Sequence, residues 1–442
     1  MNKVRILKSS VLIGICFLLA FALVPGVLFA GGQTEEKSET GKPYEGVTLD
    51  IMAGNHFWFN SIEVLFDEFE EMTGCTIVTD KTMDLDLYTK IKTAIKPNSS
   101  DYDICVVDQV WLAEFVRNGI LEELDKYTDI DNGFPWSLDN IMPSYVEGLS
   151  TYNGTLYTIP LGGHSNFLAY RTDLFEEAGI AAPPKNFDEL LNVSKKLTTD
   201  EHSGIVMRAR KGHPIVYTWL QYFYPFGGKF FDDNWKPQLS SPDGVRSLEY
   251  LIELTNYAPE DVESYTFSEM LNSFQQGKSA IYQDANVPGI IENPDAGKAI
   301  LGKVAYAPFP TGKTNSTVMA GWSLGIPKAA ENKELAWMLI QYQSSRINAP
   351  ETFKAGRDPI LVSSFNDPDV KAVVPDYPFE VVEDNLKYAN PDFRPRIPEL
   401  SKIQEVLGLF LSEALAGEKT AEEALQAADV AIEEIMSDAG YY

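Results

Sequence analysis

The alternation of short apolar strands with amphipathic helices constrains this chain more than any other feature of its sequence. Strand patterns at 47–52, 76–79 and 103–107 alternate with helical apolar spacing at 61–72, 85–95 and 111–116. The third strand is almost entirely apolar, as expected where both faces of a strand are covered. This alternation predicts an α/β fold built on a parallel sheet.

The same alternation resumes after Gly162-Gly163. Strand patterns at 168–170, 205–207 and 280–283 are separated by helical patterns, and the last hundred residues are dominated by helices at 333–344, 403–415 and 421–437. Two units of this kind need roughly 400 residues, more than one hydrophobic core can organise. The sequence therefore predicts two α/β domains.

The N-terminus has the pattern of an export signal. Lys3, Arg5 and Lys8 precede an apolar run at 11–24, and Leu28-Phe29-Ala30 offers a small residue at which cleavage can occur. The run is long enough for a permanent membrane anchor as an alternative. Pro25 and Gly26, just before Ala30, favour removal. We expect a signal peptide at 1–30, cleaved near Ala30, and a polar, flexible tether at 31–46.

Two consequences follow from such cleavage. Cys16 lies inside the apolar run, where it is a poor site for lipid attachment, so we expect a periplasmic protein without a lipid anchor. The formal charge of −28 becomes −31 when the three cations of 1–30 are lost. A protein this acidic repels nucleic acid and anionic lipid headgroups, so neither is an expected partner.

The two remaining cysteines are predicted to stay reduced. Cys75 and Cys105 fall on the second and third strands of the first domain. In a 2-1-3 strand order the first strand lies between them, which separates them by roughly 10 Å. This distance is too long for a disulfide, so buried free thiols are expected.

The motifs that would indicate catalysis are incomplete. Residues 321–325 match the G-x-S-x-G elbow, but that fold needs a histidine downstream of the serine, and the last histidine is His213. The 312–314 stretch resembles a phosphate loop, yet Ala307 stands where the motif needs glycine. The histidines lack metal-ligand spacing. We expect no catalytic residue, metal or cofactor, although the many carboxylates leave a glycosidase pair open.

Polar and aromatic residues gather instead at turns next to strands. The stretches 55–58, 108–111 and 284–286 follow strands, 162–166 lies at the passage between the domains, and 321–323 precedes a strand. Open α/β sheets bind ligands at the carboxyl ends of their strands. Charged and amide groups bond hydroxyls, and an indole face covers the C–H surface of a sugar or polyol. The sequence thus favours capture of a polyhydroxylated solute, with ordinary packing as the alternative for each single tryptophan.

Basic residues add two further candidates. Arg208 and Arg210 belong to the densest basic cluster, 208–212, and would share a face if 205–210 continued as a strand. They could hold a ligand or a cleft carboxylate, or form part of a surface loop. Arg357, within 355–359, is similar in kind.

Several stretches resemble a known family. They are YNGTLYTIP at 152–160, the run at 170–198, FQQGKSAIYQDA at 274–285 and AGWSLGIPKAAENKELAWMLIQY at 320–342. Their order and spacing resemble the extracytoplasmic carbohydrate-binding proteins of ABC importers, which include the maltodextrin-binding protein. The run from Arg208 to Trp235 is similar to the subgroup that binds sorbitol, mannitol and related sugars.

The resemblance implies an α/β, two-lobed periplasmic-binding-protein fold of type II, with the ligand cleft between the lobes. Three hinge crossings are implied near 162–165, 283–286 and 323–327. Lobe 1 would combine 47–163 with 285–323, and lobe 2 would combine 165–283 with 327–442. The implied ligand-binding residues are His56, Trp58, Asp108, Trp111, His164, Arg208, Asp284, Gly321, Trp322 and Arg357.

The resemblance also implies a function and a partner. A monomer would capture a sugar or polyol without a chemical step and deliver it to the membrane permease of an ABC importer. Two alternatives remain at this point: an exported carbohydrate-active hydrolase or lyase, and a sugar receptor for a sensory partner.

Overall fold

The structure, a computed structural model, describes residues 41–442. The chain divides into a segment, Met1–Gly41, and a compact unit, Lys42–Tyr442. The predicted signal peptide, its cleavage site, Cys16 and most of the tether lie outside the described residues. Among the described helices, none combines the length and the apolar character that crossing a membrane requires.

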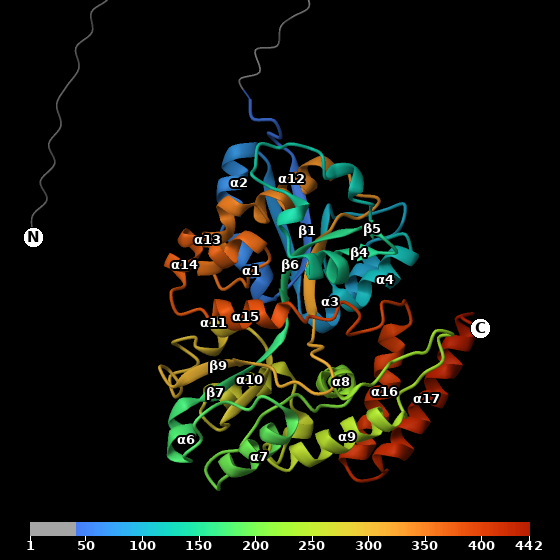
Figure 1. Ribbon diagram of the computed structural model, residues 1–442. Coiled ribbons are helices and arrows are strands. Elements are labelled where there is room, and N and C mark those ends of the chain that lie inside the picture. Colours follow the sequence, from blue (N-terminus) through green and yellow to red (C-terminus); the bar gives the residue numbers. More distant parts are fainter. Residues whose placement is uncertain (1–40) are drawn as a thin grey trace, which may run out of the picture. The chain divides into compact units, whose positions relative to one another are not determined.

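The first sheet has five strands in the order β2-β1-β3-β10-β6. Their bounds are β1 (Thr48–Gly54), β2 (Thr76–Thr82), β3 (Ile104–Asp108), β6 (Thr158–His164) and β10 (Ala320–Gly325). β1 pairs in parallel with β2 and β3, whereas β10 runs antiparallel to β3 and β6. The side chains of β6 are all buried. Figure 1 shows this sheet in the half of the unit that also contains α1, α2 and α12.

The predicted strand order of the first domain is confirmed. β1 lies between β2 and β3, as in the 2-1-3 arrangement. Cys75 precedes β2 and Cys105 lies within β3; both are buried free thiols, as expected. Burial raises the pKa of the Cys105 thiol to about 12, so this group stays protonated and chemically inert.

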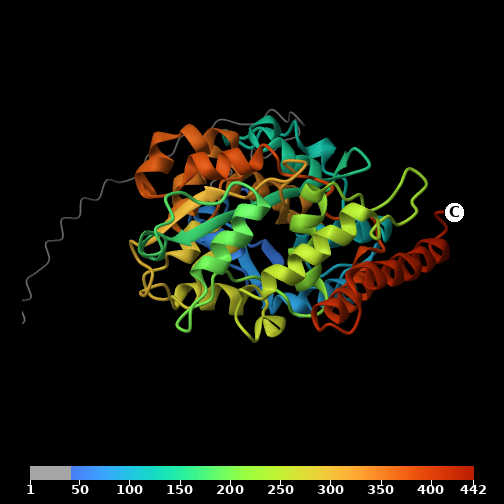
Figure 2. The same ribbon diagram turned by 60° about the horizontal axis from the view of Figure 1, so that its bottom comes forward.

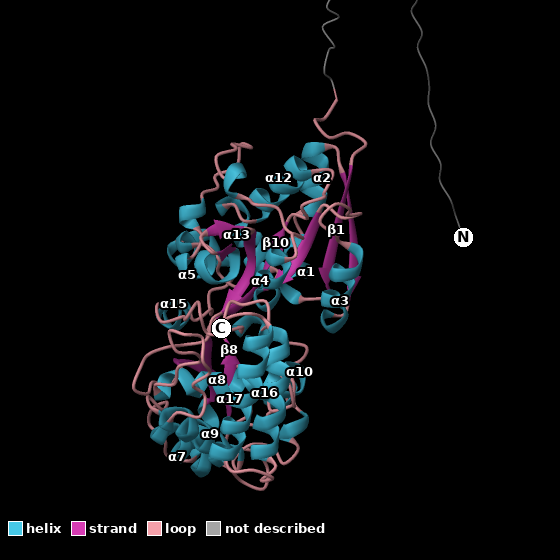
Figure 3. Ribbon diagram, turned by 90° about the vertical axis from the view of Figure 1, so that its right-hand side faces the viewer, coloured by secondary structure: helices cyan, strands magenta, loops and turns pink. Residues whose placement is uncertain are grey.

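The second sheet has three strands in the order β8-β7-β9. Their bounds are β7 (Asn166–Arg171), β8 (Ile281–Ala285) and β9 (Val304–Pro308). Both β8 and β9 run antiparallel to β7. A separate apolar core around Phe167, Met270, Phe274 and Tyr282 covers this sheet. The side view in Figure 3 separates the strands of the two sheets, with β1 and β10 in one half and β8 in the other.

Helices cover both sheets. In the first half they are α1 (Phe57–Glu63), α2 (Phe66–Thr73), α3 (Asp84–Ala94), α4 (Gln109–Arg117), α5 (Pro143–Tyr145) and α12 (Lys333–Gln343). In the second they are α6 (Thr172–Glu177), α7 (Phe187–Leu197), α8 (His213–Phe226), α9 (Pro242–Thr255), α10 (Phe267–Gln275) and α11 (Pro288–Ile291). The C-terminal part adds α13 (Ala349–Lys354), α14 (Pro368–Val373), α15 (Phe379–Leu386), α16 (Leu400–Leu415) and α17 (Ala421–Asp438).

The C-terminal helices return to the second half of the unit. α16 packs against α8 and α17, and α17 packs against α9. In Figure 2, α16 and α17 form a red pair beside the yellow-green helices. A short antiparallel hairpin, β4 (Thr151–Tyr152) and β5 (Thr155–Leu156), stands apart from both sheets.

The strand pairing differs from the predicted lobe boundaries in two places. The segment 285–323 was expected in the first lobe, but β9 pairs with β7 in the second sheet. The segment 327–442 was expected in the second lobe, but α12 lies against the first sheet, where Asn332 Nδ2 donates to Thr48 O and Asp103 Oδ2. The chain enters the second sheet at Ser165 and returns to the first between β9 and β10. A crossing at 323–327 is not seen, because β10 remains paired with β3 and β6 up to Gly325.

The strand considered for residues 205–210 is also not formed. Val206 makes a single bridge to Tyr282, and residues 207–210 are irregular. The backbone N–H groups of Ala209 and Arg210 both donate to Tyr265 O instead. Arg208 is therefore positioned by a loop.

Candidate ligand-binding site

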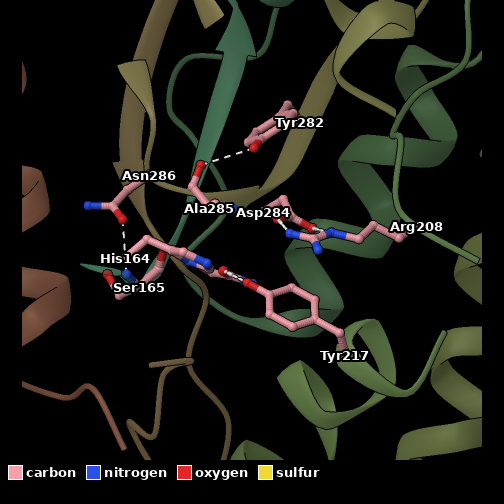
Figure 4. Close-up of polar contacts among 9 residues, drawn as sticks. His164, Ser165, Arg208, Tyr217, Tyr282, Asp284, Ala285 and Asn286 are labelled. Atoms are coloured by element: carbon pink, nitrogen blue, oxygen red, sulfur yellow. Dashed lines mark hydrogen bonds and ion pairs between the residues drawn. The ribbon is translucent and has the colours of Figure 1, made fainter. Parts of the chain in front are cut away.

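The predicted site residues meet where the chain passes between the two sheets. β6 ends at His164, Ser165 connects, and β7 begins at Asn166. The Ser165 N–H donates to Asn286 Oδ1 at 2.9 Å, and the Asn286 N–H donates to Ser165 O at 3.0 Å. This reciprocal pair fixes the end of β8 beside the crossing (Figure 4).

A buried ion pair lies next to this crossing. Arg208 Nε donates to Asp284 Oδ2 at 2.8 Å, and its Nη2 donates to Asp284 Oδ1, which gives a two-pronged contact. The Asp284 side chain is fully buried. The guanidinium carbon of Arg208 lies 4.1 Å from the ring centre of Tyr217, whose hydroxyl donates to Asn166 Oδ1 at 2.6 Å. Such charge-assisted, bidentate bonds hold both side chains in one orientation.

Four rings from the first half form a continuous aromatic group. The ring centres of His56 and Trp322 are 5.2 Å apart and the rings are stacked, while Trp111 meets Trp322 edge-on at 5.3 Å. Trp58 lies 4.9 Å from His56. His56, Trp58 and Trp111 follow β1 and β3. Trp322 was expected before a strand but lies inside β10, whose antiparallel pairing with β3 brings it to the other rings.

The indole of Trp58 is hydrogen-bonded to the buried carboxyl group of Asp358. Its indole Nε1 donates to Asp358 Oδ2 at 3.0 Å, and the Tyr377 hydroxyl donates to Asp358 Oδ1 at 3.0 Å. Burial raises the pKa of Asp358 to about 7, against the lowering effect of the two hydrogen bonds. Trp58 is 2% exposed, whereas Trp322 is only partly buried. The two indoles thus have different surroundings.

The histidines of the site are uncharged near neutral pH. Burial lowers the pKa of His56 to about 3. Burial, followed by the charges of Arg208 and Arg394, lowers the pKa of His164 well below its ordinary value. The ring centre of His164 lies 5.8 Å from that of Trp58 and 6.1 Å from that of Tyr217. His164 therefore connects the aromatic group with Tyr217, the ring that Arg208 covers.

Two predicted residues are engaged with the backbone. Arg357 donates to Leu161 O, Gln343 O, Pro160 O and Gln343 Oε1 at 2.7–3.4 Å. At Gly321, an added Cβ would lie 2.5 Å from Gly162 O, so β10 and β6 can approach only without a side chain there.

Asp108 lies at the end of β3, where its side chain accepts from the Val110 N–H at 3.2 Å and caps α4. Because β3 pairs with β10, Asp108 stands directly opposite Trp322. The strand-end pattern located this residue correctly beside the other candidates.

Sequence reasoning missed Tyr217, Asp358 and Arg394. Tyr217 lies in α8 among apolar residues, where nothing separates it from a core position. Asp358 follows the predicted Arg357, but its burial depends on Trp58, 300 residues away. Arg394 stands between Phe393 and Pro395 in an irregular stretch, where only its positive charge in an acidic chain could have marked it.

Among residues 41–442, no group of His, Cys, Asp and Glu side chains has the arrangement to hold a metal ion. The site offers instead flat aromatic faces next to hydrogen-bonding charges. Such a combination can bind a small molecule that has both C–H surface and polar groups.

Comparison with known proteins identifies the family. Residues 59–349 match the family described as bacterial extracellular solute-binding protein. The chain belongs to this family. The predicted resemblance is confirmed, and so is the two-lobed α/β fold, because the solved relatives that superpose on the chain are binding proteins of this type.

Three relatives illustrate the range of similar solute-binding proteins. A solute-binding protein from Agrobacterium radiobacter, solved in complex with ribitol, is 30% identical, with a TM-score of 0.81 over 89% of this chain and 100% of that one. The mannitol-binding protein of Pseudomonas aeruginosa is 26% identical over 80% of this chain and 85% of its own length. A Sinorhizobium fredii protein named as a probable amino-acid ABC transporter periplasmic-binding protein is 24% identical over 90% and 92%.

Proposed function

We propose that this protein captures a sugar or polyol outside the cytoplasm and delivers it to the permease of an ABC importer, without a chemical step. The observation that carries the proposal is that His164 connects the two sides. Its ring centre lies 5.8 Å from that of Trp58, in the indole group, and 6.1 Å from that of Tyr217, whose ring the Arg208 guanidinium covers. Indole faces cover the C–H side of a polyhydroxylated ligand, and charged groups bond its hydroxyls. Relatives named for mannitol, and solved with ribitol, support this ligand class.

The proposed mechanism is closure of two lobes on the ligand. One lobe carries the five-stranded sheet with α12, and the other carries the three-stranded sheet with α8, α9, α16 and α17. A ligand that touches His56, Trp58, Asp108, Trp111 and Trp322 on one side, Arg208 and Asp284 on the other, and His164 at the crossing favours the closed state. We assign Gly321 and Arg357 a supporting role, because Gly321 lies against the β6 backbone and the guanidinium of Arg357 is occupied by Leu161, Pro160 and Gln343.

The same proposal covers the location and state of the protein. We propose a periplasmic monomer, released by cleavage near Ala30 and without a lipid anchor, whose partners are the small ligand and the permease. The formal charge, −28 for the whole chain and −31 after loss of Lys3, Arg5 and Lys8, disfavours binding to nucleic acid.

Calorimetric titration with ribitol, D-mannitol and a panel of L-amino acids tests the proposal. We expect stoichiometric binding of a polyol with no product formed. Trp322→Ala should lower the affinity at least tenfold, about 1.4 kcal/mol. Trp58→Ala should also weaken binding, but with a loss of about 3–5 kcal/mol in the free energy of unfolding, since this indole is buried.

The matched control is Trp235→Ala. Trp235 is 41% exposed and packs on Phe231 and Tyr441, away from the site residues. Its removal should leave polyol affinity unchanged. Binding of amino acids in place of polyols, or turnover of an oligosaccharide, would contradict the proposed function.

A further inference from the structure

The segment 388–399, between α15 and α16, is fastened to both halves of the unit. The Thr317 N–H donates to Tyr388 O at 2.9 Å, and the Asn390 N–H donates to Thr317 O at 3.0 Å, just before β10 of the first sheet. On the other side, the hydroxyl of Tyr224, in α8, donates to Asp392 O at 3.3 Å. The segment therefore holds its side chains between the two lobes.

A further bond ties this segment to the first half. Arg396 Nη1 donates to Glu147 O at 2.8 Å, and Arg396 Nε donates to Asp392 Oδ1 at 2.8 Å. Phe393 is buried and meets the ring of Tyr217 edge-on at 5.8 Å. Arg394, between Phe393 and Arg396, is thus carried on a backbone that is fixed on both sides.

Arg394 projects into the candidate site. It is 4% exposed, and its guanidinium carbon lies 5.3 Å from the ring centre of Tyr217, the same ring that Arg208 covers at 4.1 Å. Burial lowers its pKa, and the charge of Asp108, across from Trp322, acts in the opposite direction. Charges from both lobes therefore surround this one side chain.

One hydrogen-bond donor of Arg394, the buried Nε–H, lacks an acceptor in the described part of the chain. A buried N–H left without an acceptor costs about 1–3 kcal/mol, so it is expected to serve an acceptor that the protein itself does not supply.

We propose that Arg394 is a specificity-determining ligand contact, whose Nε–H donates to a hydroxyl of an uncharged polyol held between the lobes. This inference rests on the proposed function and narrows its ligand class. Two guanidinium groups, Arg208 and Arg394, are matched by two carboxyl groups, Asp284 and Asp108. The neighbouring histidines are uncharged near pH 7 because of their lowered pKa values. A site with this balance favours a neutral ligand over the corresponding sugar acid.

Three variants test the contact by calorimetric titration with ribitol and D-mannitol, and with D-ribonate and D-mannonate as the matched acids. Arg394→Gln removes the positive charge and the guanidinium group. Arg394→Lys keeps the positive charge that faces Asp108 but lacks the Nε–H. We expect each to bind the polyols at least tenfold more weakly. The control Arg246→Gln removes an exposed cation of α9 that pairs with Asp243, and it should change polyol affinity less than twofold.

The outcomes separate this inference from the proposed function. Full polyol affinity in Arg394→Lys, or an equal loss in Arg246→Gln, would overturn the contact while leaving polyol capture intact. Wild-type protein that binds the acids as tightly as the polyols would overturn the neutral-ligand assignment. Wild-type protein that binds no polyol would overturn the proposed function and this contact together.

Discussion

At the scale of single residues, the most unusual group is the carboxyl of Asp358. It is buried beneath Trp58, accepts bonds from Trp58 Nε1 and Tyr377 Oη, and has Tyr145 nearby. Its neighbour Arg357 directs its guanidinium to Leu161, Pro160 and Gln343, so it is not a hydrogen-bonded partner of this carboxyl. Without a paired cation, burial outweighs the two hydrogen bonds and raises the pKa of Asp358 to about 7.

This carboxyl predicts a pH-dependent stability. Between pH 4 and 7 the folded protein keeps a proton on Asp358 that the unfolded chain, with an ordinary aspartate pKa near 3.8, has released. The contribution of Asp358 to the free energy of unfolding therefore falls as the pH rises, by up to about 1.4 kcal/mol per pH unit. Urea unfolding of wild type and Asp358→Asn at pH 5, 6 and 7 tests this. The free energy of unfolding of the wild type should fall relative to that of the variant as the pH rises. Parallel pH profiles would contradict this.

The residues that meet in the candidate site were partly predictable from the sequence. Strand-end position grouped His56 and Asp108, because the ends of the neighbouring strands β1 and β3 meet at one edge of a sheet. Trp322 joins them from inside β10, through antiparallel pairing with β3. The role of Arg357 could not be read in this way. Two of its acceptors lie on β6, almost 200 positions earlier, and two belong to Gln343 of α12, so only the folded chain shows that they occupy its guanidinium.

At the scale of elements, the contact between α16 and the loop that carries Arg208 is unusually close. A Cβ added at Gly408, within α16, would lie 2.5 Å from Gly212 Cα and 2.7 Å from Gly212 O. Gly212 has φ +95°, a conformation that side chains rarely adopt. Two glycines thus let a helix backbone support the loop at 208–212.

Gly408→Ala tests this support. In an exposed helix the change would gain about 1 kcal/mol of helix propensity. Here the added methyl meets backbone that cannot rotate away, and overpacking of this kind costs about 1–3 kcal/mol. We expect a net loss in the free energy of urea unfolding. Gly289→Ala, where no heavy atom lies within 4 Å of the added Cβ, is the control and should not destabilise. Equal behaviour of the two variants would exclude the close contact.

Most elements were predictable because their apolar spacing is regular. Helix α7 and the 2-1-3 order of the first strands follow the sequence pattern closely. The stretch 345–399 was not resolved into elements in advance. It consists of short helices, α13 to α15, separated by irregular backbone. Their placement depends on distant partners: α13 packs against α1, and α15 packs against β7 and β9. That irregular stretch is also where Asp358 and Arg394 lie.

At the scale of the whole Lys42–Tyr442 unit, the sequence predicted two sheets but misassigned β9 and α12. The alternation of apolar and polar residues shows where a strand lies in the sequence. It does not show which sheet the strand joins, because that depends on the strands with which it pairs. β9 is antiparallel to β7, so the connection from β8 through α11 stays in the second lobe. The return to the first lobe falls between Pro308 and Ala320. The chain therefore passes between the lobes at Ser165, before β10 and in the segment 388–399.

Ligand-driven closure about these crossings is the prediction that belongs to the whole molecule. A ligand that contacts both lobes binds the closed state better and shifts the population toward it. Saturating ribitol or D-mannitol should therefore reduce the radius of gyration measured by small-angle X-ray scattering. At a hundred times the dissociation constant, it should also raise the free energy of unfolding by about 2.7 kcal/mol.

Trp322→Ala supplies the internal comparison for closure. At a ligand concentration that saturates the wild type but not this variant, the variant should scatter like the unliganded protein. At a concentration that saturates both, the two should again agree, since the crossings are unchanged. Binding without any change in the radius of gyration would mean that the contacts to both lobes are already made in the unliganded state. Ligand binding would then shift no conformational equilibrium, and the liganded and unliganded proteins would present the same conformation to a permease.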